Sequence, residues 1–291
     1  MNDKTITPQF DHFIITLFNL KNFLDGSNKE AVWLKWTEDR LKLFEEYCLP
    51  SVINQTTHSF KWLLYFDKSS PSHIIEQIKK ITTPYDFIHI MYAEGYEDFI
   101  NQYLIDLKEL AISDWIIQTR FDNDDILHES ALETIQSLLN FQHNSFINLS
   151  SGYTFEKSTK YLSHYYYSMG PFLTLIENKH QNLKGIYLVN HWQWPGMKLQ
   201  LFKEIFKRLT LINDNISFYV KKPMWIQFIH EKNMHNSANR GIPVFFQTDL
   251  TKFHENLTMK ISPVKRLFSH IHYVWWKRYL KAFLAKYYIK S

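Results

Sequence analysis

The stretch WIIQTRFDNDD, residues 115–125, decides the fold. Trp115–Thr119 is mostly apolar or β-branched, a composition that favours a buried strand. The chain then continues through Arg120 into three carboxylates within four residues, Asp122, Asp124 and Asp125. Carboxylates this close repel one another, so their joint ionisation needs a cation or solvent between them. The stretch therefore predicts a buried strand that ends in a polar site.

Segments with strand and helix patterns alternate on both sides of this stretch. Apolar runs predict strands at residues 12–18, 61–66, 87–92, 115–119, 148–155, 186–189, 217–220 and 225–229. Helical spacing predicts helices at residues 32–49, 74–81, 97–110, 128–141 and 197–209, with Pro50 ending the first. Such alternation implies crossover connections, and hence an α/β fold with a mostly parallel sheet flanked by helices. Ligands of open sheets bind beyond the carboxyl ends of the strands, where Asn19, Asp67 and the acidic cluster fall.

Composition places the chain among globular proteins of the cytoplasm. It has 291 residues, of which 45% are hydrophobic and 21% are charged. The single Cys48 excludes an internal disulfide or a multi-cysteine metal site and fits a reducing compartment. The polar opening Met1–Phe10 does not resemble a signal peptide, and no apolar run approaches the roughly 18 residues of a spanning helix.

Charge is distributed unevenly along the chain. Residues 256–291 carry eight Lys or Arg and no Asp or Glu, whereas residues 1–255 carry 25 basic and 29 acidic side chains. We therefore expect a catalytic domain over 1–255 and a basic, aromatic helical tail over 256–291. Trp275, Trp276 and Tyr279 are amphipathic rings of the kind found at a bilayer interface, so the tail suits an anionic membrane surface. The alternative is a helix whose aromatic side packs on the domain.

The acidic cluster suggests a metal site. Mn²⁺ or Mg²⁺ would reverse the repulsion, because these hard cations take carboxylate oxygens together with water and a substrate diphosphate. A strand-end carboxylate aimed at a metal, such as Asp124, is expected to add little to the stability of the core. The alternative is a solvated acidic loop that caps the helix beginning near His128.

Three groups of residues resemble known families. Asp67, with Arg120-Phe121-Asp122-x-Asp124-Asp125, resembles the D-x-D glycosyltransferases of the GT-A fold over roughly residues 10–250. A longer pattern is similar to the bacterial family labelled "putative rhamnosyltransferases": Phe44-Glu45-x-Tyr47-Cys48-Leu49-Pro50-Ser51-Val52, Gln55-Thr56, Phe60-x-Trp62-Leu63 and Phe66-Asp67. Trp225-x-Gln227-x-x-His230 with Asn233 resembles a later motif of that family, although Glu231 stands where the family has glycine.

The resemblance implies transfer of a sugar from a nucleotide-sugar to a hydroxyl acceptor in bacterial surface-polysaccharide synthesis. The family label points to an activated rhamnose. By similarity, Asp67 would contact the base or ribose, Asp122 the ribose or the metal, and Asp124 the metal. His230 would complete the metal shell as a neutral imidazole. Asn19 and Arg120 join the donor-binding set, Arg120 because its planar fork suits carboxylates or phosphate. The alternatives are a turn residue for Asp67 and a core or surface histidine for His230.

We expect the transfer to invert the configuration at the anomeric carbon of the sugar. Such a reaction requires a general base that takes the proton of the acceptor hydroxyl. Glu177 is the preferred candidate because an apolar stretch precedes it and would desolvate it, and Asp125 is a second, nearer the metal. The alternative for Glu177 is an exposed carboxylate at the end of an element. Trp192 and Trp194 flank one residue, so on an extended segment they share a face on which an acceptor saccharide, free or lipid-linked, would stack. Core packing is the alternative for that face.

Two other functions fit parts of the sequence. A nucleotidyltransferase would also place acidic residues at strand ends, but it would carry a glycine-rich basic loop after the first strand. Asn19–Asn28 has one Gly and one Lys. A nucleic-acid-binding protein would be basic over its body as well as its tail. Because the body is acidic, no nucleic acid partner is expected.

Overall fold

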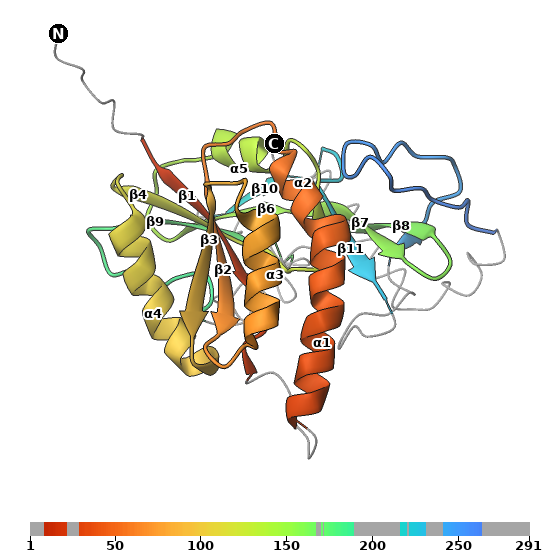
Figure 1. Cartoon of the computed structure of the whole chain (residues 1–291). Helices are drawn as coiled ribbons and strands as arrows, with labels where there is room; N and C mark the ends of the chain where they lie inside the picture. Colours follow the sequence, from red (N-terminus) through yellow and green to blue (C-terminus); the bar gives the residue numbers. More distant parts are fainter. Residues whose placement is uncertain are drawn as a thin grey trace, which may run out of the picture.

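A computed structural model describes residues 9–21, 29–166, 170, 172–188, 216–219, 221–230 and 241–263. Its main sheet has seven strands in the order β10-β6-β9-β4-β1-β2-β3 (Figure 1). The strands are β1 (Asp11–Leu17), β2 (Lys61–Asp67), β3 (Ile88–Ala93), β4 (Trp115–Arg120), β6 (Ser145–Leu149), β9 (Thr174–Asn178) and β10 (Ile216–Tyr219). All neighbours pair in parallel except β9, which is antiparallel to both β4 and β6. This confirms the expected GT-A-like α/β class with a mostly parallel sheet.

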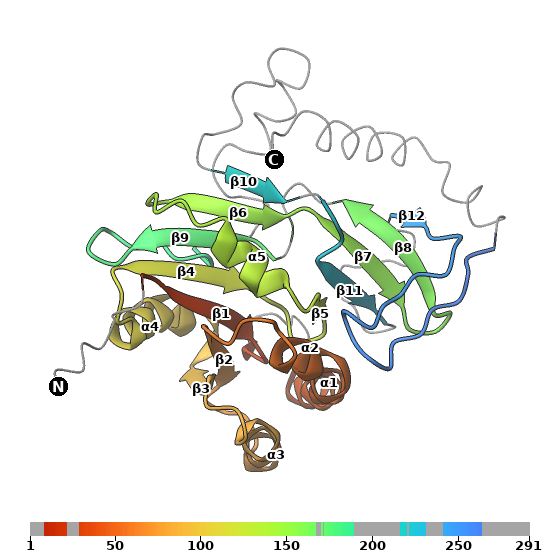
Figure 2. The ribbon, with the colours of Figure 1, turned by 90° about the horizontal axis from the view of Figure 1, so that it is seen from above.

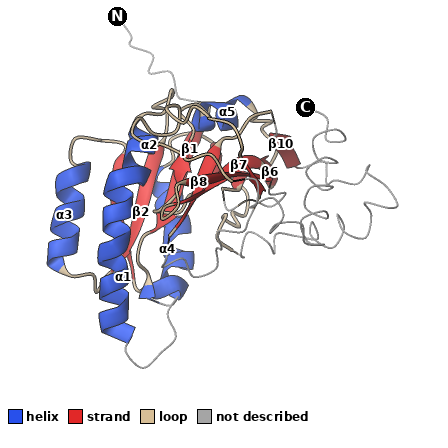
Figure 3. Ribbon diagram, turned by 90° about the vertical axis from the view of Figure 1, so that its right-hand side faces the viewer, coloured by secondary structure: helices blue, strands red, loops and turns tan. Residues whose placement is uncertain are grey.

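Helices cover both faces of the sheet. They are α1 (Lys29–Leu43), α2 (Leu49–Ile53), α3 (Ser72–Thr82), α4 (Gly95–Leu110) and α5 (Ala131–Ser137). One core joins the face of Ile14 and Trp62 to α1, α3 and α5. The other joins the face of Phe13 and Tyr65 to α4, and Figures 2 and 3 show the two layers. Alternate residues of each strand thus serve opposite cores, as the two-residue period of a strand requires.

The first helical segment does not end at Pro50 as the sequence predicted. Residues Phe44–Cys48 form a π-helical turn, and the chain continues as α2 to Ile53. A proline inside a helix has no N–H for the carbonyl four residues earlier and crowds it. Here that carbonyl belongs to Glu46, and it accepts a hydrogen bond from His254 Nε2 at 2.9 Å instead. The wider turn and this substitute donor let the chain pass Pro50 without breaking.

A second sheet was not predicted. Its strands, in the order β12-β8-β7-β11-β5, are β12 (Ile242–Pro243), β8 (Tyr161–Tyr166), β7 (Ser151–Glu156), β11 (Trp225–Ile229) and β5 (Ile126–Leu127). The single strand expected at 148–155 is in fact β6 and β7, which belong to different sheets. The second sheet lies beside β6 and β10 of the main sheet (Figure 2).

Three other sequence predictions concern the strand at residues 186–189 and the helices at residues 128–141 and 197–209. The strand expected at 186–189 is wrong for residues 186–188, which form a turn and a bend. Side chains take the backbone donors there, because Ile186 N–H bonds Gln118 Oε1 and Tyr187 N–H bonds Tyr103 Oη. The last helix before residue 145 is shorter than the expected 128–141. The helix expected at 197–209 lies outside the described residues.

The packed body extends beyond residue 255. Leu257 and Met259 are buried in a third core with Ile226 and Phe228 of β11. Residues 264–291, which hold most of the expected tail, lie outside the described part. Within the ranges that are described, no helix is both long and apolar enough to cross a membrane.

We predict that Gly152→Ala destabilises the protein. A Cβ on Gly152 would overlap the indole ring of Trp225, which is completely buried between the two sheets. Overpacking of this kind costs about 1–3 kcal/mol, measurable by urea unfolding. Ser158→Ala, in the exposed turn after β7, is the matched control and should leave the free energy of unfolding unchanged. Equal stability of the Gly152→Ala protein and the wild type would contradict this packing.

Candidate functional site

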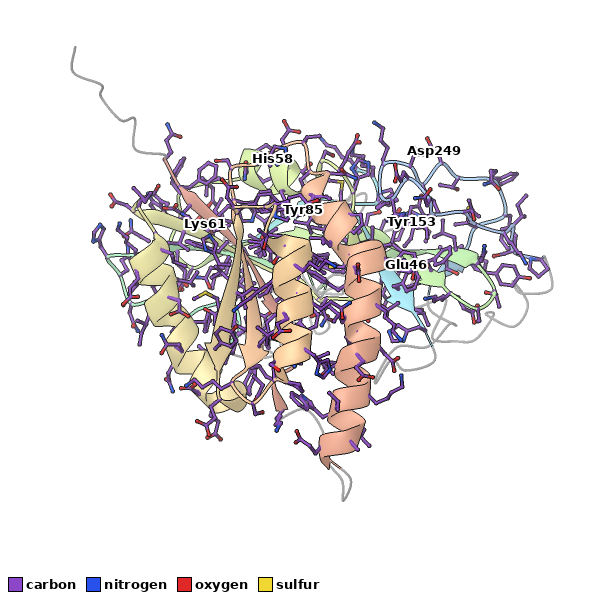
Figure 4. All side chains as sticks on the ribbon, in the orientation of Figure 1. Glu46, His58, Lys61, Tyr85, Tyr153 and Asp249 are labelled. Atoms are coloured by element: carbon purple, nitrogen blue, oxygen red, sulfur yellow. The ribbon has the colours of Figure 1, made fainter. Side chains whose placement is uncertain are left out.

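The carboxyl ends of three adjacent strands, β1, β2 and β4, carry the sequence-predicted site. Asn19 follows β1, Asp67 ends β2, and the acidic cluster follows β4. At the opposite edge of the sheet, where β2 begins, Lys61 (labelled in Figure 4) forms an ion pair with Asp11 at 3.1 Å.

Asp67 and Asn19 form one buried network. Asp67 is 3% exposed, and its carboxylate accepts hydrogen bonds from Lys21 N–H, Gly95 N–H and both the N–H and Oγ of Ser69. Asn19 Oδ1 accepts the backbone N–H of Asp67 at 3.0 Å. The network ties the ends of β1 and β2 to the start of α4. Asp67 therefore does more than form a turn, which was the alternative. Contact between Asp67 and a nucleotide-sugar donor stays a prediction.

Asp124 is at the centre of the site. It is 5% exposed and pairs with Arg40 of α1 and with His230 Nε2, which lies 3.2 Å from Asp124 Oδ2 at the end of β11. Burial alone would raise the pKa of Asp124, but the Arg40 guanidinium and His230 hold that pKa below its ordinary value. The structure thus brings Asp124 and His230 together, as the sequence predicted, and adds Arg40.

The contact with Arg40 corrects the expectation that Asp124 contributes little to stability. Removing one partner of a buried ion pair leaves the other charge uncompensated, at a cost of about 3–5 kcal/mol. Sequence reasoning missed Arg40, although a signal was available. Arg40 lies four residues after Trp36 and seven after the buried Trp33, so a cation occupies the apolar face of the helix.

Asn123 and Asp125 hold the acidic loop in place. Asn123 Nδ2 donates to the carbonyl of Phe18 at the end of β1, and Asp125 Oδ1 accepts the N–H of Phe228 at 2.9 Å. Burial, reinforced by repulsion from Asp124 and Asp122, raises the pKa of the Asp125 carboxyl well above its ordinary range. The loop is therefore fixed to β1 on one side and to β11 on the other.

Asp122 and Arg120 lie where the cluster opens to solvent. The Asp122 side chain is 42% exposed, whereas that of Asp124 is 7% exposed. Arg120 Nε lies 4.0 Å from Asp122 Oδ1, and its guanidinium stands over the ring of Tyr187 at 4.9 Å. Asp122 is thus the carboxylate of the cluster that a ligand from solution reaches first.

Glu177 is not brought to the cluster. It is completely buried, as expected, but it lies on β9 opposite Ile116, four residues before Arg120 on β4. Its carboxylate accepts hydrogen bonds from Gln118 Nε2 and from the backbone N–H groups of Lys184 and Gly185. Glu177 thus positions residues 184–187, and with them the Tyr187 ring beneath Arg120. Its function as a general base stays a prediction. Trp192 and Trp194, the predicted acceptor contacts, lie outside the described residues.

A metal ion would have to compete for Asp124. In the part of the chain that the structure describes, no three His, Cys, Asp or Glu side chains are grouped to hold a metal. Asp124 Oδ2 is shared by Arg40 and His230. Binding of Mn²⁺ or Mg²⁺ by Asp122, Asp124 and His230 therefore stays a prediction.

A mostly parallel sheet with carboxylates gathered beyond the carboxyl ends of its strands is the arrangement expected of the GT-A-like fold. The chain belongs to the family described as "Putative rhamnosyl transferase", whose profile matches residues 28–241. This confirms the predicted family and enzyme class. No curated protein sequence matches the chain significantly.

Solved structures resemble the chain at low identity. Residues 1–349 of S. aureus TarS in complex with UDP superpose with a TM-score of 0.41 at 14% identity, over 75% of this chain and 60% of that one. For the glycosyltransferase GlyE of Streptococcus pneumoniae TIGR4, the TM-score is 0.35 at 12% identity, over 81% of this chain and 58% of that one. The chain therefore spans less than two thirds of either protein.

We predict that Glu177→Gln lowers stability. The amide nitrogen of a glutamine at this position would face N–H groups, which are donors and cannot accept its hydrogen bond. A buried polar group without a partner lowers the free energy of unfolding by about 1–3 kcal/mol. The free energy of unfolding should fall accordingly. Glu76→Gln on the exposed face of α3 is the control. A general base predicts the reverse pattern, with unchanged stability and a kcat about 10²–10⁴-fold lower.

Proposed function

We propose that this protein transfers a sugar from a nucleotide-sugar donor to a hydroxyl group of a saccharide or lipid-linked saccharide in bacterial surface-polysaccharide synthesis. One observation carries the proposal: in a chain of this family, the acidic cluster after β4 is buried and paired, yet opens to solvent at Asp122. Rhamnose as the transferred sugar follows the family's description.

The proposed donor site combines the groups at the ends of β1, β2 and β4. Asn19 and Asp67 would bind the nucleoside, since ligands of open sheets occupy this edge. Asp122, Asp124 and His230 would hold Mn²⁺ or Mg²⁺, which when bound supplies positive charge to the departing diphosphate. Arg120 would hold Asp122 or a phosphate oxygen with its planar fork.

We further propose inversion with Asp125 as the general base. Of the two candidates named from the sequence, Asp125 is the one in the cluster. It adjoins Asp124, one of the residues proposed to hold the metal.

The first test of this function uses Asp124→Asn. We expect transfer to be abolished because the variant loses the charge proposed to hold the metal, while the amide keeps the shape of the side chain. The measurement is transfer from a panel of nucleotide-sugars with Mn²⁺, Mg²⁺ or chelator, alongside the melting temperature. Asp114→Asn is the control, because Asp114 precedes β4 at its opposite end and its side chain is 65% exposed. Full activity in chelator, or in Asp124→Asn, would refute the metal-dependent mechanism.

We also propose that the basic tail places the enzyme on the inner face of the plasma membrane, where a lipid-linked acceptor would lie. Each Lys or Arg near an anionic surface contributes on the order of 1 kcal/mol. The full chain should therefore sediment with anionic vesicles, and less so at high salt, whereas a chain ending at Ser262 should not. Ser262 is a suitable end point because the packed segment extends to it. Equal binding of both chains, or binding that ignores lipid charge, would contradict the proposal.

A further inference from the structure

Three buried nitrogen atoms at the candidate site have no hydrogen-bond partner. They are Trp36 Nε1, Arg40 Nε and Arg120 Nε, and all other unpartnered buried side-chain atoms in the described ranges are oxygens. Buried N–H groups are almost always paired in folded proteins, so each exception needs an explanation. Three such donors around one acidic cluster point to a site that binds a hydrogen-bond acceptor.

The donors come from two sides of the cluster. Trp36 and Arg40 lie one turn apart on α1, with the guanidinium carbon of Arg40 5.1 Å from the centre of the indole ring. Arg120 comes from β4 and is held over Tyr187. The positive charges of Arg40 and Arg120 both act on Asp122, whose side chain is open to solvent. Both guanidinium groups therefore lie close to Asp122, the partly exposed carboxylate of the cluster.

The chemistry of these groups selects an anion. Indole and guanidinium nitrogens donate and never accept, so neither a metal ion nor another cation satisfies them. Arg40 already uses Nη1 for Asp124 and Asn123 Oδ1, and its Nε–H stays available without breaking either contact. Arg40 is also only 9% exposed, and at such a site charge-assisted hydrogen bonds to phosphate oxygens are strong and directional. Donors from two separate elements suit a group with several oxygens better than a single carboxylate.

We propose that Arg40, Trp36 and Arg120 bind the diphosphate of the nucleotide-sugar donor, with Asp124 holding the Arg40 guanidinium in position for it. The proposal rests on the proposed function, because that function supplies the diphosphate. It assigns to α1 a direct part in donor binding. It also explains why a cation and an indole N–H are buried on the apolar face of this helix.

The test is calorimetric titration with inorganic pyrophosphate, in chelator and in Mn²⁺, so that neither base nor sugar contributes. Arg40→Lys keeps a cation beside Asp124 but removes the Nε–H and the planar fork. Trp36→Phe removes one N–H and keeps an aromatic ring. We expect pyrophosphate Kd to rise about tenfold or more for Arg40→Lys and about threefold for Trp36→Phe, consistent with the loss of one charged and one neutral hydrogen bond. Trp115→Phe at the start of β4 and Lys80→Gln, an exposed residue of α3, are the matched controls and should bind like the wild type.

Parallel titrations with nucleosides and nucleoside diphosphates separate this inference from the proposed function. If the inference is right, the variants lose affinity for the diphosphates and keep it for the nucleosides. Wild-type pyrophosphate affinity in both Arg40→Lys and Trp36→Phe would overturn it, even if the enzyme transfers sugar. A wild-type protein that binds pyrophosphate through Arg40, but neither binds nor uses any nucleotide-sugar, would instead overturn the proposed function.

Discussion

Negative charge in the loop Asp122–Asp125 is the constraint on which the rest of the site depends. Three carboxylates in four residues cannot be buried unless each finds a separate solution. Asp124 pairs with Arg40 and His230, Asp125 accepts the N–H of Phe228, and Asp122 stays partly in water. Each solution uses a different element, so the requirement to accommodate the charges also fixes α1 and β11 relative to β4.

The same requirement connects the two sheets. β5 follows directly from the acidic loop and pairs with β11, which brings Phe228 to Asp125 and His230 to Asp124. From the other direction, His254 bonds the π-helical turn after α1 through the Glu46 carbonyl. Polar contacts as well as packing therefore bind β11 to the acidic loop, and they bind the segment around His254 to the turn after α1.

Local sequence patterns account for the parts of the fold that they encode. The strands β1 to β4 and the acidic loop are continuous in the chain, so apolar runs and their boundaries predicted them from neighbouring residues alone. The contacts of Arg40 and Glu177 could not be predicted in this way. Arg40 and Asp124 are 84 residues apart, and the partner of Glu177 on β4 is set by the pairing of β9. Glu177 also shows that a desolvated carboxylate, which the sequence predicted correctly, is compatible with a structural role once backbone donors surround it.

The π-helical turn Phe44–Cys48 determines the rotational phase of α1. Each residue of an α-helix turns the chain by about 100°, because 3.6 residues complete one turn. A π-helical turn accommodates one residue more than an α-helical turn, so it rotates everything before it relative to everything after it. With Leu49 and Pro50 anchored in α2, an uninterrupted α-helix would direct Trp36 and Arg40 about a quarter turn away from Asp124. The π-helical turn beside Pro50 therefore determines that the face of α1 carrying Trp36 and Arg40 is the one turned toward the acidic loop.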